Sequence, residues 1–189
     1  MRIIAGEARG RKLVSPRDAS VRPPLDRMRG SIFQVLEGTF EGRAVLDLYA
    51  GTGSMGLEAV SRGARRATFV ENAESSLRIL RKNIERTGFL SRCEVLRGDA
   101  LWVPDLAGVA PFALVFLDPP FRCFSEEGGP ERILSRVRAI IESDALERGG
   151  NVMLRYPAEH RGPISLPVAE SRTYGESVVL RFEKPPSEV

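Results

Sequence analysis

The sequence has few cysteines and no long apolar run, and both shortages narrow the class of protein. Cys93 and Cys123 are its two cysteines, thirty positions apart, and no CxxC pair occurs. Neither a disulfide framework nor a metal site is indicated. No apolar stretch approaches the ~20 residues of a membrane span, and the N-terminus lacks the apolar core of a signal peptide. We therefore expect a cytoplasmic protein with reduced thiols and no membrane contact.

Histidine is scarcer still. His160 is the single histidine and lies in a polar connector, so we expect it to be solvated rather than catalytic. No Ser/His/Asp set and no cluster of metal ligands is present. At 189 residues the chain fits one globular domain, since domains usually run ~100–200 residues.

Charge is modest overall but unevenly distributed. The net charge is +3, yet residues 1–30 carry eight Arg or Lys against three acids, a net +5 that leaves −2 for the rest. A basic segment on a near-neutral body suggests a polyanionic partner such as a nucleic acid. The alternative is a solvated segment that keeps the protein soluble, and charge alone leaves both interpretations open.

From residue 43 onward, apolar runs alternate with amphipathic stretches, which predicts right-handed βαβ units and a parallel sheet covered on both faces. The predicted strands are 44–48, 67–70, 93–96, 112–117, 151–155, 164–166 and 177–182, and the predicted helices are 55–62, 73–87 and 130–143. Parallel order followed by a terminal hairpin is the pattern of α/β, Rossmann-like class I methyltransferases. These have a seven-stranded, mostly parallel sheet whose last strand is antiparallel.

We expect residues 1–42 to form a basic N-terminal extension packed on a methyltransferase domain of residues 43–189. Apolar residues on either side of a turn at 6–10 predict a small hairpin, and the prolines that follow predict an irregular stretch. Asp26 is expected to cap a helix over residues 27–36.

A glycine-rich loop follows the predicted strand at 44–48. Gly51, Gly53 and Gly56 have the G-x-G-x-x-G spacing, which by itself fits a nicotinamide cofactor or S-adenosylmethionine (SAM). Asp47 ends the strand, where a carboxylate would repel a pyrophosphate but suits the ammonium and sulfonium groups of SAM. We therefore favour SAM as the cofactor over a nicotinamide or a turn without a ligand.

Acidic residues also end the next two predicted strands. Glu71 is placed to accept hydrogen bonds from both ribose hydroxyls, and Asp99, followed by Ala100, could accept from the adenine amino group. The carboxyl ends of parallel strands meet at one edge, where such sheets bind ligands. We expect Asp47, the glycine loop and these residues to form the cofactor site.

The sequence Asp118-Pro119-Pro120-Phe121 follows the predicted strand at 112–117. The prolines stiffen the turn, so that the Asp118 carboxylate and the Pro119 carbonyl can face one amine as acceptors. Phe121 can stack on a base, an interaction worth about 1–3 kcal/mol. The alternative is a rigid loop with an ordinary core phenylalanine. Downstream of a SAM loop we favour methylation of an exocyclic amine, with Asp118, Pro119 and Phe121 as the catalytic residues.

Motifs along almost the whole chain resemble the RsmD family, bacterial enzymes that methylate a guanine N2 in small-subunit (16S) ribosomal RNA. They are RIIAGEARGR at 2–11, RPPLDRMR at 22–29, LDLYAGTG at 46–53, LEA at 57–59, SRGA at 61–64, DPPF at 118–121 and YGE at 174–176. Many amino-methyltransferases share the SAM loop and DPPF, whereas the N-terminal segment is specific to this family. Pro24, Leu25 and Gly30 depart from the family's usual residues, and Phe121 stands where tyrosine is common.

The resemblance implies that the acidic edge holds SAM, that DPPF holds the guanine, and that the basic extension contacts RNA phosphates and could also close over the methionine end. The residues expected to contact RNA are Arg9, Arg11, Lys12, Arg22, Arg27 and Arg29. The implied partner is ribosomal RNA or the small ribosomal subunit, with no obligate protein partner.

Three other functions remain as alternatives. DPPF also serves adenine-N6 methyltransferases that act on DNA or RNA, and a non-catalytic ribosome-assembly factor could use the same fold. A nicotinamide oxidoreductase is disfavoured because no His or Tyr-Lys set is available for proton transfer.

Overall fold

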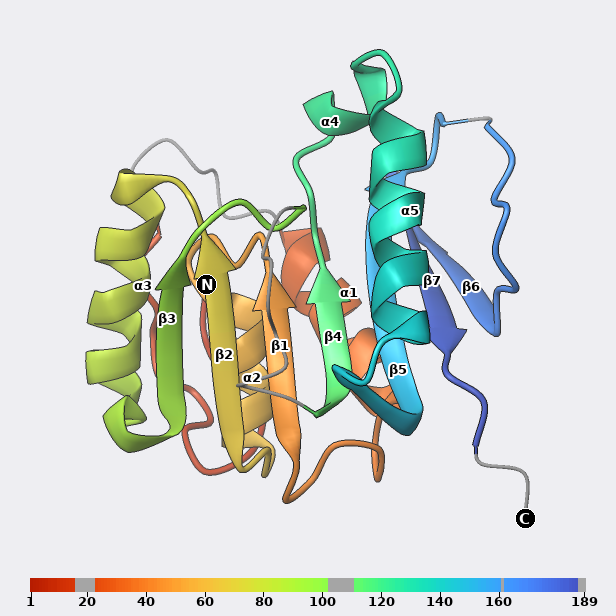
Figure 1. Cartoon of the computed structure of the whole chain (residues 1–189). Coiled ribbons are helices and arrows are strands. Elements are labelled where there is room, and N and C mark those ends of the chain that lie inside the picture. The colour runs from red at the N-terminus through yellow and green to blue at the C-terminus, as the bar shows by residue number, and fades with distance from the viewer. Residues whose placement is uncertain (16–22, 102–110, 161, 187–189) are drawn as a thin grey trace.

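The computed structural model describes residues 1–15, 23–101, 111–160 and 162–186. A seven-stranded sheet in the order β3-β2-β1-β4-β5-β7-β6 runs through the molecule, with helices on both faces (Figure 1). The strands are β1 (Ala44–Leu48), β2 (Arg66–Glu71), β3 (Cys93–Arg97), β4 (Phe112–Leu117), β5 (Leu146–Pro157), β6 (Glu170–Tyr174) and β7 (Ser177–Glu183). The helices are α1 (Pro23–Val35), α2 (Ser54–Ser61), α3 (Glu74–Thr87), the 3-10 turn Leu90–Arg92, α4 (Arg122–Ser125) and α5 (Gly129–Glu142).

The first five strands pair in parallel, and β7 is antiparallel to both of its neighbours, β5 and β6. The prediction of a seven-stranded class I methyltransferase sheet with its last strand reversed is therefore confirmed. Every residue of β1 and β4 is buried, because helices cover both faces of the sheet. This burial explains why these strands are apolar throughout except at Asp47.

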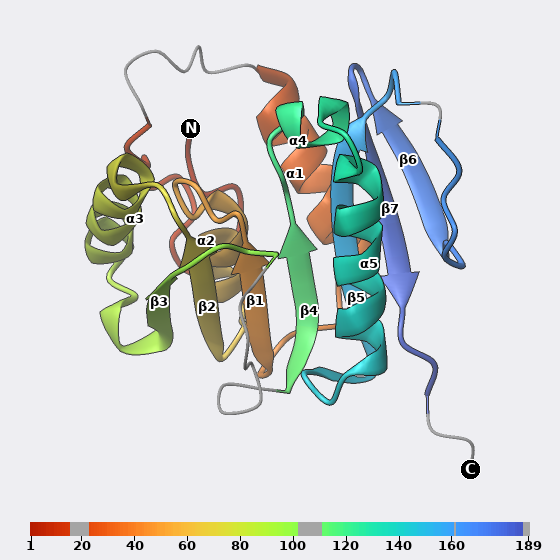
Figure 2. The same ribbon diagram turned by 45° about the horizontal axis from the view of Figure 1, so that its top comes forward.

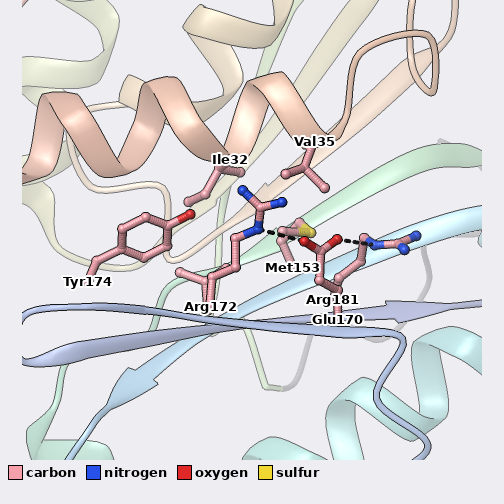
Figure 3. A pocket seen from close by; sticks show the side chains of 8 residues that line it. Ile32, Val35, Met153, Glu170, Arg172, Tyr174 and Arg181 are labelled. Atoms are coloured by element: carbon pink, nitrogen blue, oxygen red, sulfur yellow. Dashed lines mark hydrogen bonds and ion pairs between the residues drawn. The ribbon is translucent and has the colours of Figure 1, made fainter.

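Helices α1, α2 and α3 cover one face of the sheet, and α5 covers the other (Figures 1 and 2). One core cluster joins Ile32, Phe33 and Leu57 to the strands, and the other joins Ile133 and Val137 to the opposite face. A small hollow between α1 and strands β5 to β7 is lined by aliphatic side chains and by a Glu170 that bonds two arginines (Figure 3). None of its lining residues belongs to the predicted site.

Two predicted elements need correction. Residues 164–166 do not form a strand; β6 lies later, at Glu170–Tyr174, because the tight turn at Gly175 sets the pairing of Tyr174 with Ser177. Ile164 and Leu166 instead pack on the core from a loop.

The second correction concerns the first helix, which begins at Pro23 rather than at residue 27. Proline is tolerated in a first helical turn, where the backbone N–H groups lack helical partners. Asp26 is therefore not the cap but lies within the first turn, where it accepts a hydrogen bond from Arg29. Among the described residues, no helix is long and apolar enough to cross a membrane.

Residues 1–15, called the arm below, run along the outside of α2 and α3. The predicted hairpin is present: Arg2 bridges Lys12 in antiparallel fashion, and Ile3 exchanges backbone hydrogen bonds with Arg11 and Gly10. A Cβ atom on Gly6 would lie 1.7 Å from the Ser61 carbonyl oxygen, so the arm approaches α2 too closely for any larger residue there.

Candidate active site

The carboxyl ends of β1, β2 and β4 lie side by side. The predicted residues Asp47, Glu71 and Asp118 lie at or just beyond these ends. Asp47 on β1 is in register with Phe69 of β2 and Phe116 of β4. The backbone N–H of Asp118, one residue beyond β4, is 3.4 Å from the Leu48 carbonyl. The sequence prediction that the cofactor loop and DPPF share one edge of the sheet is therefore confirmed in geometry.

Asp47 is buried, with 2% of its surface exposed, and Oδ2 accepts a 2.9 Å hydrogen bond from the Gly56 N–H. Burial raises the pKa of Asp47 to about 8, and the carboxylates of Asp118 and Glu71 add to the rise while the Gly56 bond opposes it. A ligand with cationic groups would relieve both the burial cost and the repulsion between carboxylates. The sulfonium and ammonium groups of SAM have that chemistry.

The glycine loop follows β1 in a strained backbone. Tyr49 has a φ of 59°, a left-handed conformation that costs a non-glycine residue free energy and often marks a functional site. Gly53 has a φ of 81°, and a Cβ atom there would lie 2.3 Å from the Leu80 side chain. Asn83 fixes the loop by donating to the Thr52 carbonyl at 2.9 Å.

Glu71 binds this loop directly. Its Oε2 accepts a 2.7 Å hydrogen bond from the Gly51 N–H, and Oε1 accepts from Asn72 and Ala73 at 2.9 and 2.8 Å. The carboxylate is thus oriented at the edge of the sheet. Since a carboxylate offers about four acceptor positions, it retains capacity for a ribose hydroxyl. That role stays a prediction.

The two residues assigned to the adenine side differ in position. Asp99 is exposed and accepts a hydrogen bond from the Leu101 N–H at 2.9 Å, whereas Ala100 is buried in the core. Sequence reasoning missed Tyr49, whose pKa burial raises to about 12, with further rises from Cys123 and Asp99. Tyr49 itself is half-buried at the start of the glycine loop, packed against one core cluster.

Asp118 is partly exposed, at 35% of its side chain, and forms an ion pair with Arg155 at the end of β5. Burial raises the pKa of Asp118, and the charge and hydrogen bond of Arg155 lower it. The Arg155 guanidinium also lies over the Phe121 ring, 4.8 Å from its centroid. Pro119 is buried, so its ring holds the turn in place.

Arg155 is, with Tyr49, a residue at this edge that sequence reasoning did not find. A signal was available, because Arg155 is a charged residue in the otherwise apolar run Val152–Tyr156, which ends at the same edge as DPPF. The described residues contain no group of His, Cys, Asp and Glu side chains that could hold a metal ion.

The basic residues predicted to contact RNA fall into three groups. Arg9, Arg11, Lys12 and Arg27 are exposed, and Arg11 donates a 2.7 Å hydrogen bond to the Arg86 carbonyl at the end of α3. Arg22 lies outside the described residues.

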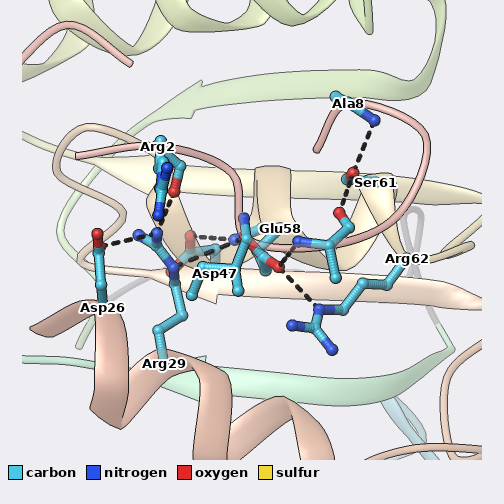
Figure 4. A network of polar contacts seen from close by, with 11 residues as sticks. Arg2, Ala8, Asp26, Arg29, Asp47, Glu58, Ser61 and Arg62 are labelled. Atoms are coloured by element: carbon cyan, nitrogen blue, oxygen red, sulfur yellow. Dashed lines mark hydrogen bonds and ion pairs between the residues drawn. The ribbon is translucent and has the colours of Figure 1, made fainter. Parts of the chain in front are cut away.

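Arg29 requires a correction, because it is not available to RNA. It is 2% exposed, donates to the Arg2 carbonyl and to Asp26, and lies 3.7 Å from Glu58 (Figure 4). A buried cation needs charged partners, and the network of α1, α2 and the arm supplies them. Arg29 therefore holds the arm and α1 together and does not face solvent.

Glu58 is the centre of this network and has no exposed surface. Its carboxylate accepts hydrogen bonds from the backbone of Ile4 and Ala5 at 2.8 and 3.0 Å and from Arg62 at 2.8 Å. Ser61, one turn further along α2, accepts from the Ala8 N–H at 3.0 Å. Sequence reasoning included Glu58 in a motif but did not predict this contact with the arm.

An α/β sheet with one reversed strand, a glycine loop beside the buried Asp47, and a DPPF turn on the neighbouring strand together define a class I SAM-dependent methyltransferase. The fold is similar to that of an RNA methyltransferase from Salinibacter ruber solved with S-adenosyl-L-homocysteine. That match has a TM-score of 0.60, 19% identity and 94% and 97% coverage of the two chains.

The particular family follows from the match of the sequence to a family model. The chain belongs to the family described as conserved hypothetical protein 95, whose model matches residues 1–183, and this is the RsmD family that the motifs predict. It is 31% identical over 185 residues to "Putative rRNA methyltransferase YlbH" of Bacillus subtilis, covering 97% of this chain and 92% of that protein.

Two further matches come from Escherichia coli. The ribosomal RNA small subunit methyltransferase D of strain K12 is 38% identical over 122 residues, which cover 65% of this chain and 61% of that protein. The solved structure titled "Putative methyltransferase yhhF" superposes with a TM-score of 0.76 at 28% identity and covers 99% of both chains.

Proposed function

We propose that the protein transfers a methyl group from SAM to the exocyclic N2 amine of a guanine in 16S ribosomal RNA. The observation that carries the proposal is that Asp118 follows β4, the strand paired with the β1 strand of Asp47. The Asp118 N–H also contacts the carbonyl of Leu48, the residue after Asp47. An amine held at Asp118 would lie beside a cofactor held at Asp47. The name of the Escherichia coli relative, a small-subunit ribosomal RNA methyltransferase, supports the choice of RNA.

When bound, SAM supplies an electrophilic methyl group on a sulfonium, and its loss leaves a neutral thioether. The chain's own residues act on the amine. The lone pair of an exocyclic amine is delocalised into the ring, which makes the amine a poor nucleophile. The Asp118 carboxylate and the Pro119 carbonyl accept hydrogen bonds from its two N–H groups and so make that lone pair available. The nitrogen gains the methyl carbon and loses one proton. Asp118 accepts that proton, a role that its raised pKa favours.

The remaining residues position the two substrates. Phe121 stacks on the base, which must leave any helical stack to reach the turn, at a cost of a few kcal/mol. Glu71 and the glycine loop hold the ribose and the methionine part of SAM. Four exposed residues of the N-terminal extension contact RNA phosphates: Arg9, Arg11, Lys12 and Arg27.

The test is incubation of labelled SAM with unmodified small subunits and, separately, with naked 16S ribosomal RNA, followed by nucleoside digestion and separation. We expect label in N2-methylguanosine, and a loss of about 10²–10⁴-fold in rate for Asp118→Ala with SAM binding retained. Label in N6-methyladenosine would replace guanine by adenine as the substrate. Bound SAM without transfer to either RNA would favour a non-catalytic assembly factor.

A further inference from the structure

Arg155 contacts the two side chains that the proposed function assigns to the substrate base. Its Nε forms an ion pair with Oδ1 of Asp118, and its Cζ lies 4.8 Å from the centroid of the Phe121 ring. The guanidinium therefore donates to the carboxylate where the amine is expected to donate. It also lies over the ring where the base is expected to stack.

A guanidinium resembles one edge of guanine. It is planar and delocalised, it presents N–H donors in a fixed fork, and it stacks on aromatic rings. In guanine, C2 is bonded to the ring nitrogens N1 and N3 and to the exocyclic N2, so this part of the base is itself a guanidine. The N1–H and N2–H groups point in the same direction, as the donors of an arginine fork do.

We propose that Arg155 occupies the base-binding position in the free protein and that the substrate base displaces it. The inference rests on the proposed function, because it takes Asp118 and Phe121 as the residues that bind the base. It adds that the incoming base must replace Arg155 at both side chains before it can bind.

The competition favours guanine over the other three RNA bases. To replace the arginine at Asp118, a base should offer an amine next to a ring N–H, and guanine alone does so. Adenine and cytosine place an unprotonated ring nitrogen beside the amine, so its lone pair would face the carboxylate. Uracil has a ring N–H but no amine. Loss of a charged donor without an equivalent replacement leaves Asp118 poorly paired.

Displacement also changes Asp118 itself. Burial raises the pKa of this carboxyl and Arg155 lowers it, so the departure of the arginine makes Asp118 a better proton acceptor. A displaced Arg155 can turn toward solvent, since 23% of its side chain is exposed. It can also bind the Ser177 hydroxyl on β7, which lies 3.4 Å from its Nη1. Binding of the base and activation of Asp118 would then be one event.

The test compares Arg155→Met, which removes the donors, and Arg155→Lys, which keeps the charge but not the planar fork. Guanosine and adenosine 5′-monophosphates are titrated into each protein with S-adenosylhomocysteine present, and the ring signals of Phe121 are followed by NMR. We expect Arg155→Met to bind both nucleotides about five- to tenfold more tightly than wild type, with the guanine nucleotide still the tighter of the two and Arg155→Lys in between. Arg78→Met, at an exposed position on α3, is the matched control and should not differ from wild type.

Weaker binding of the guanine nucleotide to Arg155→Met would overturn the inference, since it would make Arg155 a resident contact of the base. Equal affinity in all variants would also overturn it, because Arg155 would then not compete with the base. These readouts measure binding in the absence of turnover. If the titrations contradict the inference but N2-methylguanosine is still formed in RNA, the proposed function stands. If no N2-methylguanosine is formed, the comparison of nucleotide affinities is still valid.

Discussion

Two carboxylates are buried at α2, Glu58 within the helix and Asp47 against it, and their partners are of opposite kinds (Figure 4). Glu58 has no exposed surface, and four protein groups compensate its charge: the N–H groups of Ile4 and Ala5 and the cations Arg62 and Arg29. Asp47 is nearly as buried, at 2% exposure. It accepts one backbone hydrogen bond, from Gly56, and its charged neighbours are the carboxylates Asp118 and Glu71.

The difference separates a structural contact from a binding site. A buried charge surrounded by donors and cations is complete, and its effect is to hold the arm against α2. A buried carboxylate among other carboxylates has a perturbed pKa and lacks a cationic partner there, which is common where a protein binds a charged ligand. Burial alone would not have told these two acids apart; their partners do.

The largest effect is expected from breaking the complete network. Glu58→Ala would leave the Arg29 and Arg62 guanidinium groups and two backbone N–H groups without their acceptor. The free energy of unfolding should fall by about 3–5 kcal/mol, as for other buried pairs that lose one partner. Urea denaturation measures the loss, and amide exchange should show Ile4 and Ala5 becoming unprotected.

The matched control is Glu85→Ala, at an exposed position on α3, which should change stability by no more than about 0.5 kcal/mol. A similarly small change for Glu58→Ala, with the arm amides still protected, would show that Glu58 does not hold the arm.

The next effect is expected at the open edge. Glu71→Ala should weaken SAM by roughly ten- to hundredfold, because bonds to a charged acceptor are worth about 1.5–3 kcal/mol. Calorimetry measures the affinity, and Glu71→Gln should lose less because its amide oxygen can still accept from the Gly51 N–H. Glu74→Ala, at an exposed position in the first turn of α3, is the control. Unchanged affinity in folded Glu71→Ala would mean that the ribose is held elsewhere.

The features that could be predicted from the sequence are those with a local signal. The strands at 44–48 and 112–117 were found to the residue, because buried parallel strands are continuous apolar runs. The glycine loop and DPPF follow them directly, so their places at the carboxyl edge could also be deduced. These are local signals, in which a few neighbouring residues determine both the element and its position.

The errors concern contacts between distant segments. Arg29 looks like any basic residue until α1 brings it to Glu58, twenty-nine positions later, and Arg155 meets Asp118 across thirty-seven. The penultimate strand was misplaced because Ile164 and Leu166 alternate with a polar residue as in a half-buried strand. In contrast, β6 is a largely polar edge strand defined by its turn and its pairing with β7. Local pattern does not carry this information.

A smaller effect is expected on RNA binding by the exposed side of the arm. If Arg9, Arg11 and Lys12 neutralise phosphates, replacing all three with Ala should flatten the log–log salt dependence of RNA affinity by roughly two to three units. SAM affinity should barely change, because the arm's exposed side chains do not belong to the carboxyl edge. Filter binding across a range of salt concentrations measures the slope.

A variant with the same loss of charge elsewhere makes that result specific. Arg65, Arg138 and Arg148 are exposed on other parts of the surface, and their joint replacement should leave the slope near the wild-type value. Equal slopes for both triple variants and the wild type would identify the arm as a solvated surface that does not bind RNA.

The stability of the free protein is the most direct test of the comparison. Asp47→Asn keeps an oxygen for the Gly56 N–H but removes the charge. The folded pKa of Asp47 is about 8, above its ordinary value of 3.8, so the folded protein retains a proton that the unfolded chain has released between these values. Stability of the wild type should therefore fall as pH rises through this window, and Asp47→Asn should not share that fall.

At pH 8 the free Asp47→Asn protein should melt higher than wild type, by about 2–4 °C for each kcal/mol, and the gain should vanish near pH 4. Its affinity for SAM should be lower than that of the wild type, because the cationic groups lose their counter-charge. Glu58→Gln makes the same carboxylate-to-amide change at the complete network and should lower the melting temperature at pH 8, because its cations lose their partner. If the two variants shifted stability in the same direction at pH 8, the two carboxylates would be equivalent. The comparison would then give no reason to place a cationic ligand at Asp47.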